Sequence, residues 1–135
     1  MKKYFKNNGL IINGLINLSP KEAYDECKNG AIIIDMRRDY EYAYKQFDVE
    51  NTFYMTYDDI KENYKEIIED KPLIIADQAG VHSKEITKYL MDKGFINVAN
   101  LSGGMFEWDK DDMPLRINPK EMLSGSCLCV LRKKS

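Results

Sequence analysis

The chain is 135 residues long, which suits one domain, and 44% of its residues are hydrophobic, which is enough for a core. Its 20 lysine and arginine residues are nearly balanced by 22 aspartate and glutamate residues, giving a net charge of −2 with both signs mixed along the chain. We expect no nucleic-acid partner, because phosphate binding usually needs a basic face. The basic cluster at residues 132–134 is interpreted as a solvated tail.

Neither a targeting signal nor a membrane span is expected. The apolar residues between positions 10 and 16 are too few and too interrupted for either. We therefore expect no membrane partner and a cytoplasmic location. The three cysteines are an odd number and do not form a disulfide framework, so we interpret them as reduced thiols.

Short apolar runs alternate with helical patterns, which predicts an α/β domain with a largely parallel sheet. The first helix begins at Ser19, with Pro20 in its first turn and Glu22 placed to complete a capping box, and it ends at Asn29-Gly30. Further helices are expected at about 39–44, 57–69, 83–94 and 103–108. Strands are expected at 31–34, 52–55, 72–76 and 97–100.

We divide the chain into three parts: an N-terminal extension (1–17), the α/β domain (18–116) and a tail (117–135). The composition turns irregular beyond Pro114, which sets the second boundary. The tail contains Cys127 and Cys129.

The most specific pattern runs from Leu73 to Trp108. It contains an apolar strand, a six-residue polar loop, a helix, Gly94-Phe95, a strand, Leu101-Ser102-Gly103-Gly104 and then Trp108. This order resembles the rhodanese family, in which a catalytic cysteine opens the loop and a tryptophan follows a Leu-x-Gly-Gly sequence. The resemblance extends over roughly residues 18–115. It implies a sheet of about five parallel strands with helices on both faces.

The loop after the strand at 72–76 is the candidate binding site. Backbone N–H groups at a strand-to-helix junction converge, and the helix dipole adds partial positive charge, so such a loop suits an anion. We expect the amides between Gln78 and Ser83 to converge on the Asp77 carboxylate, a water or an anion. The resemblance adds Asp35 and Arg37, which match the end of the family's Ile-Asp-Val-Arg strand. The candidate binding residues are Asp77, Gln78, Ala79, Gly80, Val81, His82, Ser83, Asp35 and Arg37.

The resemblance places Asp77 where the family has its cysteine nucleophile. A carboxylate cannot hold a persulfide, and its charge would repel thiosulfate or phosphate. His82 stands where the family often has arginine, and histidine offers neither a permanent charge nor a bidentate fork. An aspartyl nucleophile would need a metal and further carboxylates. We therefore expect no catalytic residue of the standard mechanism and lean against an enzyme.

The pair Cys127 and Cys129 could relay sulfur, cycle between redox states or supply half of a zinc site. A zinc site needs about four ligands, and Cys27 and His82 are the remaining soft candidates. We favour an apolar tail that packs on the domain, and we expect no metal and no cofactor.

Three hypotheses for function remain open. The first is a non-catalytic binding or regulatory module for a protein or small-molecule ligand. The alternative is a sulfurtransferase or sulfur-relay protein that uses Cys127 or Cys129. A weaker third is a phosphatase-like reader of phosphate, because a related loop occurs in some dual-specificity phosphatases.

Overall fold

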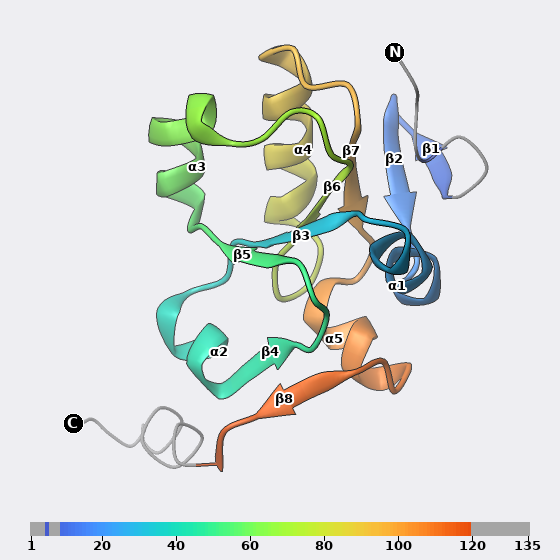
Figure 1. Cartoon of the computed structure of the whole chain (residues 1–135), viewed down its shortest axis with the longest axis vertical. Coiled ribbons are helices and arrows are strands. Elements are labelled where there is room, and N and C mark those ends of the chain that lie inside the picture. The colour runs from blue at the N-terminus through green and yellow to red at the C-terminus, as the bar shows by residue number, and fades with distance from the viewer. Residues whose placement is uncertain (1–4, 6–8, 120–135) are drawn as a thin grey trace.

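The computed structural model describes Phe5 and residues 9–119. A six-stranded sheet with the order β1-β2-β7-β6-β3-β5 forms its centre (Figure 1). Its strands are β1 (Leu10–Ile12), β2 (Leu15–Leu18), β3 (Ile32–Asp35), β5 (Thr52–Tyr54), β6 (Leu73–Ala76) and β7 (Val98–Leu101). β1 is antiparallel to β2, whereas every other neighbouring pair is parallel. The predicted fold, a largely parallel sheet in an α/β domain, is confirmed.

Helices cover both faces of this sheet, because the side chains of its central strands alternate between two apolar clusters. Ile33 and Ile74 contribute to the cluster that contains Trp108, whereas Ile34 and Ile75 contribute to the one that contains Ile60. Helices α1 (Pro20–Lys28) and α5 (Gly104–Lys110) supply the first cluster. Helices α3 (Tyr57–Asn63) and α4 (His82–Asp92) supply the second.

Several expected elements appear with small changes in their bounds. Helix α2 (Asp39–Tyr44) is confirmed with the predicted bounds. The helix predicted at 57–69 is shorter, because α3 ends at Asn63 and a 3-10 turn, η1 (Tyr64–Glu66), follows it. In that turn the Tyr64 ring packs edge-on against Tyr89 of α4, with ring centroids 5.8 Å apart.

Sequence reasoning missed the strands before Ser19. β1 and β2 form a hairpin, and β2 pairs with β7 in the main sheet. Asn13 and Gly14, with φ of 53° and 81°, make the turn. An Asn-Gly pair between apolar residues is a strong hairpin signal, so the sequence did contain the information. A second small sheet, β4 (Lys45–Phe47) with β8 (Leu115–Ile117), was also missed because each strand has three residues.

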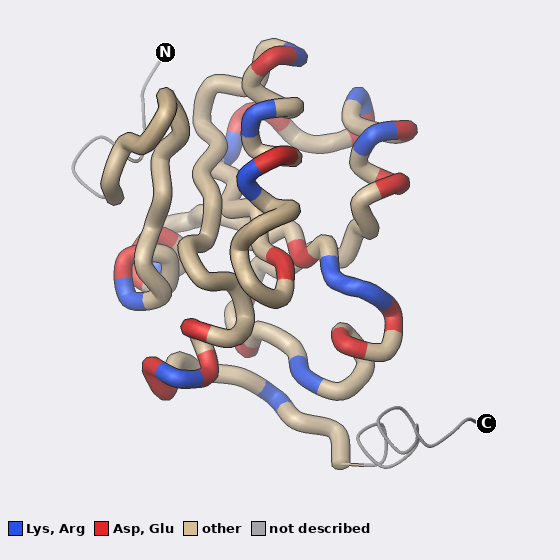
Figure 2. The backbone as a smooth tube through the Cα atoms, turned by 180° about the vertical axis from the view of Figure 1, so that it is seen from behind, with Lys and Arg blue, Asp and Glu red and all other residues tan. Residues whose placement is uncertain are grey.

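Lysine and arginine residues are interspersed with aspartate and glutamate residues along the described chain, as Figure 2 shows. Within the part of the chain that the structure describes, no helix has the length and apolar character needed to cross a membrane.

The capping box at the start of α1 is confirmed. The Ser19 hydroxyl accepts a bond from the Glu22 amide at 3.2 Å, and the Glu22 carboxylate accepts one from the Ser19 amide at 2.9 Å. The same carboxylate accepts a bond from the Gly9 amide at 3.1 Å. Glu22 therefore ties the hairpin to the first helix.

We expect Glu22→Gln to lower the free energy of unfolding by about 0.5–1 kcal/mol near neutral pH, the usual range for a weakened cap. The hydrogen bond from the Ser19 amide lowers the pKa of Glu22 below its ordinary value of 4.5. The stabilisation by the charged form is therefore complete above that value and is lost as the pH falls through the lower pKa of the folded state. Urea unfolding of both proteins from about pH 7 to about pH 3 should show the difference shrinking. A difference that stays constant with pH would contradict this account.

Candidate functional site

The site lies where β3 and β6 end, at the carboxyl edge of the parallel sheet. Asp77 directly follows β6, and Met36 and Arg37 directly follow β3, its neighbour in the sheet. The carboxyl ends of parallel strands are the usual place for ligands in open α/β sheets. The loop after Asp77 crosses this edge and leads into α4.

Asp77 is 6% exposed, and its carboxylate accepts hydrogen bonds from main-chain N–H groups of the loop. Oδ1 accepts from the Gly80 amide, and Oδ2 accepts from the amides of His82 at 2.8 Å and Ser83 at 3.2 Å. The expectation that the loop amides converge on this carboxylate is confirmed. The site's own side chain therefore occupies the anion cradle of the loop.

A buried row of polar side chains connects Asp77 to the hairpin. The Ser83 hydroxyl lies 3.4 Å from Asp77 Oδ1 and donates to Asn100 Oδ1 on β7. The Asn100 amide donates to Asn17 Oδ1 on β2 at 2.8 Å. Ser83 and Asn100 are 0% exposed, and buried polar groups of this kind are stable only when hydrogen-bonded.

Two glycines explain why the loop can lie against the start of α5. The carbonyl oxygens of Asp77 and Gln78 accept bonds from the amides of Met105 at 2.9 Å and Phe106 at 3.0 Å. Gly104 has φ of 61°, and a Cβ there would come within 2.4 Å of the Asp77 carbonyl oxygen. A Cβ on Gly80 would come within 2.7 Å of the Gly103 amide nitrogen. Gly80 in the loop and Gly104 in the Gly103-Gly104 pair of the sequence pattern thus allow this close contact.

Asp35 and Arg37 form a buried ion pair beside the loop. The guanidinium donates to both carboxylate oxygens of Asp35, from Nε at 2.9 Å and from Nη2 at 2.8 Å. Its remaining bonds go to the main-chain oxygens of Glu41 and Lys45. Since both side chains are at most 1% exposed, we interpret this pair as a buried structural ion pair between β3 and α2.

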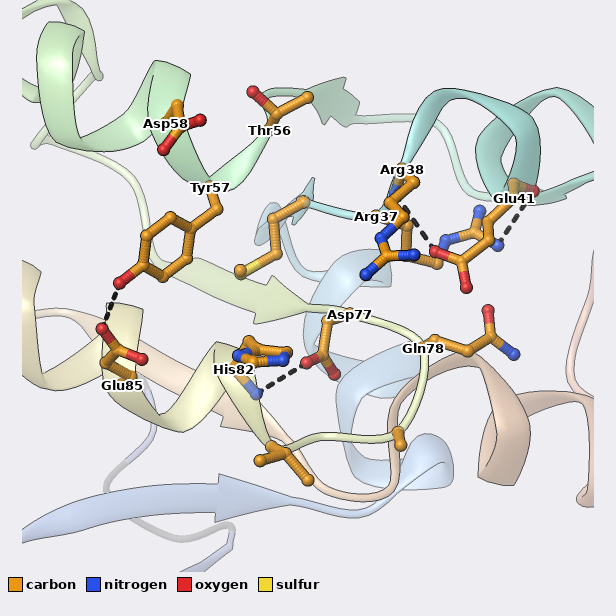
Figure 3. Close-up of a pocket in the computed structure, with 13 residues that line it drawn as sticks. Arg37, Arg38, Glu41, Thr56, Tyr57, Asp58, Asp77, Gln78, His82 and Glu85 are labelled. Carbon is orange, nitrogen blue, oxygen red and sulfur yellow. Dashed lines mark hydrogen bonds between the residues drawn. The ribbon is translucent and has the colours of Figure 1, made fainter.

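A cavity of about 770 Å³ opens above Asp77, between the beginnings of α2, α3 and α4 (Figure 3). Six of the residues that line it come from the sequence prediction: Arg37, Asp77, Gln78, Ala79, Val81 and His82. Gly80 and Ser83 bind the Asp77 carboxylate from behind, and Asp35 reaches the site through Arg37.

More than half of the lining was missed from the sequence. These residues are Met36, Arg38, Glu41, Thr56, Tyr57, Asp58 and Glu85. Most of them follow β3 or β5 in the chain. Residues that directly follow parallel strands lie at the same edge of the sheet, so this rule, applied to β3 and β5, could have predicted them. Glu85 was not within its reach, because this residue lies one turn into α4.

His82 contacts Asp77 through its main chain, because its amide N–H makes the bond to the carboxylate. Its imidazole is exposed and lies edge-on to the Tyr57 ring, with centroids 6.4 Å apart. Trp108 is a packing residue, since it is fully buried and its indole N–H donates to the Pro114 carbonyl at 2.7 Å.

The cysteines considered in the sequence analysis do not line the cavity as the structure describes it. Cys127 and Cys129 lie outside the described residues. Cys27 packs against the core, and burial raises the pKa of its thiol to about 12, so it is a poor nucleophile. Among residues 9–119 and Phe5, no group of three or more histidine, cysteine or acidic side chains is placed to hold a metal ion.

Comparison with known proteins identifies the class. The rhodanese-like domain family matches residues 19–111, and the chain belongs to that family. Among solved structures, a rhodanese-related protein from Thermoplasma volcanium superposes with a TM-score of 0.68 at 19% identity, over 76% of this chain and 98% of that one. A rhodanese-like domain protein from Staphylococcus aureus gives 0.64 at 26% identity, over 76% and 97%.

Similar sequences include named enzymes. The thiosulfate sulfurtransferase GlpE of Haemophilus influenzae is 24% identical over 102 residues, which cover 73% of this chain and 91% of that protein. The tRNA uridine(34) hydroxylase of Bacillus velezensis is 31% identical over 102 residues, which cover 70% of this chain and 31% of that protein.

We expect Gly104→Ala to destabilise the protein strongly, because its Cβ would collide with the Asp77 carbonyl. Gly94→Ala is the matched control, since Gly94 also has a positive φ, of 104°, but a Cβ added there would meet nothing within 4 Å. Backbone strain should lower the free energy of unfolding of the control variant by about 1–2 kcal/mol. Gly104→Ala should lower it by about 2 kcal/mol more because of the collision. Urea unfolding measures both, and equal losses would contradict the packing described for the loop.

Proposed function

We propose that this protein is a rhodanese-like domain without the loop nucleophile, and that it acts as a non-catalytic binding or regulatory module. Asp77 stands at the position that the family resemblance gives to the cysteine. The observation that carries the proposal is the set of bonds from the Gly80, His82 and Ser83 amides to its carboxylate. A cytoplasmic location, expected from the sequence, is part of the proposal.

The chemistry of the loop supports this function in two ways. A carboxylate cannot accept a sulfur atom and release it again, as a thiolate can through a persulfide. Its two oxygens also accept the hydrogen bonds of amides that would otherwise bind a thiolate or an oxyanion. An incoming anion therefore meets repulsion from the carboxylate and finds no free donors there. The second point also argues against a phosphate-reading role.

A second candidate is a sulfurtransferase or sulfur-relay protein that uses Cys127 or Cys129. The similarity to proteins named thiosulfate sulfurtransferase favours it. In that case a thiol of residues 127–129 would have to supply the nucleophile that the loop lacks. The two candidates differ in which substitution removes activity, and this difference can be measured.

We expect the protein with Cys127→Ser and Cys129→Ser to show no thiosulfate:cyanide sulfurtransferase turnover above the uncatalysed rate. The assay is steady-state formation of thiocyanate by this variant and by the unchanged protein. Activity present only in the unchanged protein would support the sulfur-relay alternative. Activity that persists in the double variant but disappears on adding Asp77→Ala would contradict the proposed function.

Restoring a cysteine should give a reactive thiol but little sulfur transfer. In a background of Cys127→Ser and Cys129→Ser, we expect the thiol of Asp77→Cys to react with iodoacetamide about tenfold or more faster than an ordinary free thiol, because the loop amides favour its thiolate. Thiosulfate turnover should rise further on adding His82→Arg, since a guanidinium brings a permanent charge and a fork for an oxyanion.

Two results would refute these expectations. Equal turnover with and without His82→Arg would show that the missing basic residue does not limit the site. An introduced thiol of ordinary reactivity would show that the loop does not activate an anion.

A further inference from the structure

A row of buried side-chain hydrogen bonds behind Asp77 has its direction fixed by a main-chain atom of the hairpin. The Leu15 carbonyl oxygen accepts from the Asn17 side-chain NH2 group at 3.1 Å, which turns the Asn17 side-chain oxygen toward Asn100. A carbonyl oxygen can only accept, so a turned Asn17 side chain would place two acceptors against each other. The Asn100 NH2 group donates to the Asn17 oxygen at 2.8 Å, and Asn100 Oδ1 is left to accept from the Ser83 hydroxyl.

The Ser83 hydroxyl is therefore turned away from Asp77. A serine hydroxyl has one proton, and here that proton lies in the bond to Asn100. The hydroxyl oxygen lies 3.4 Å from Asp77 Oδ1, which is too long for a strong O–H···O bond. The carboxylate has three main-chain donors, from Gly80, His82 and Ser83. The hydroxyl is a fourth donor beside the carboxylate that the row directs elsewhere.

This row crosses the place where the hairpin joins the sheet. β2 pairs with β7 through Asn17 with Asn100 and through Leu18 with Leu101 (Figure 1). Partners in neighbouring strands have adjacent side chains, so strand pairing itself brings the two asparagines together. Within the described residues, β1 pairs only with β2. A change in the pairing of the hairpin therefore acts directly on Asn17.

The sheet does not require polar side chains at this place. β6 and β7 join Leu73 with Val98 and Ile74 with Ala99, which are apolar pairs. Asn100 follows in the same strand and is fully buried, and an apolar side chain there would need no hydrogen-bond partner. The two asparagines thus indicate a role that depends on their hydrogen bonds.

Resting on the proposed binding function, we propose that the β1–β2 hairpin regulates the Asp77 loop, with Asn17 and Asn100 as positioning residues that hold the Ser83 hydroxyl away from the carboxylate. Loss of the Asn17 contact frees Asn100 to turn, so that its NH2 group donates to the Ser83 oxygen. The hydroxyl then donates to Asp77 as a fourth donor. Asp77 lines the cavity, so the number of donors on its carboxylate sets how much negative charge a ligand meets there. Coupling of this kind is reciprocal, so a ligand that binds the carboxylate also changes the stability of the hairpin.

The test compares the full-length, nitrogen-15-labelled protein with its Asn17→Leu variant by NMR. Leucine has a similar size and removes both hydrogen bonds of the asparagine side chain. We expect the amide protons of Gly80 and His82 to move upfield, because a fourth donor weakens their bonds to the carboxylate. The strongest nuclear Overhauser contacts of the Asn100 NH2 group should change from residue 17 in the unchanged protein to Ser83 in the variant.

Two further variants show whether the hydroxyl is responsible. Ser83→Ala alone should leave the two amide protons nearly in place, because the hydroxyl does not donate to Asp77 in the unchanged protein. Asn17→Leu added to Ser83→Ala should then move neither proton, since no hydroxyl remains to turn. Ile16→Ala is the matched control for a weakened hairpin, because Ile16 lies in β2 and packs against the core but takes no part in the row. It should lower the free energy of unfolding and leave both protons in place.

Three results would overturn the inference: unchanged shifts in a folded Asn17→Leu protein, the same upfield shift in the Ser83→Ala background, or an equal shift in Ile16→Ala. Should Asn17→Leu not fold, the other proteins still decide. Contacts of the Asn100 NH2 group in the unchanged protein that are stronger to Ser83 than to Asn17, or a large shift in Ser83→Ala, would refute the direction of the row. These failures would leave the sulfur-transfer prediction intact. Turnover that depends on Asp77 would remove the proposed function independently of them.

Discussion

The bonds between the Asp77 carboxylate and the loop amides are the interaction on which the rest of the site depends. Burying a carboxylate without partners is costly, and a hydrogen bond to a charged group typically contributes about 1.5–3 kcal/mol. The loop meets this need with Gly80 at φ of 87° and the amides of His82 and Ser83 turned inward. The carboxylate and the loop therefore stabilise each other.

This interaction connects the loop to the hairpin and to α5. On one side, Ser83 and Asn100 lead from the carboxylate to Asn17 in the hairpin. On the other, the carbonyl of Asp77 accepts from the Met105 amide and lies against Gly104, at the start of the helix that carries Trp108. Elements far apart in the sequence thus meet at one residue. The Asp77 carboxylate, through its bonds to the loop amides, and the Asp77 carbonyl, through its bond to Met105, hold this architecture together.

The sequence predicted best what local patterns determine. Ser19 and Glu22 form the expected capping box, and the loop amides converge on Asp77 as expected for a strand-to-helix junction. It predicted poorly what depends on tertiary pairing, since β4 and β8 are three-residue strands that pair across a long separation in the chain. Glu85 was missed for the same reason, because it becomes a neighbour of Tyr57 only when α3 and α4 pack on one face of the sheet.

The central claim is that the Asp77 carboxylate accepts hydrogen bonds from the loop amides in solution. The most direct measurement is the amide proton chemical shift of Gly80, His82 and Ser83 in the unchanged protein and in Asp77→Ala. Bonds to a carboxylate should place these three protons downfield, and the substitution should move all three upfield while leaving amides of β3 and β5 in place. Three unchanged shifts in a folded Asp77→Ala protein would show that the carboxylate does not occupy the loop, and would contradict the account.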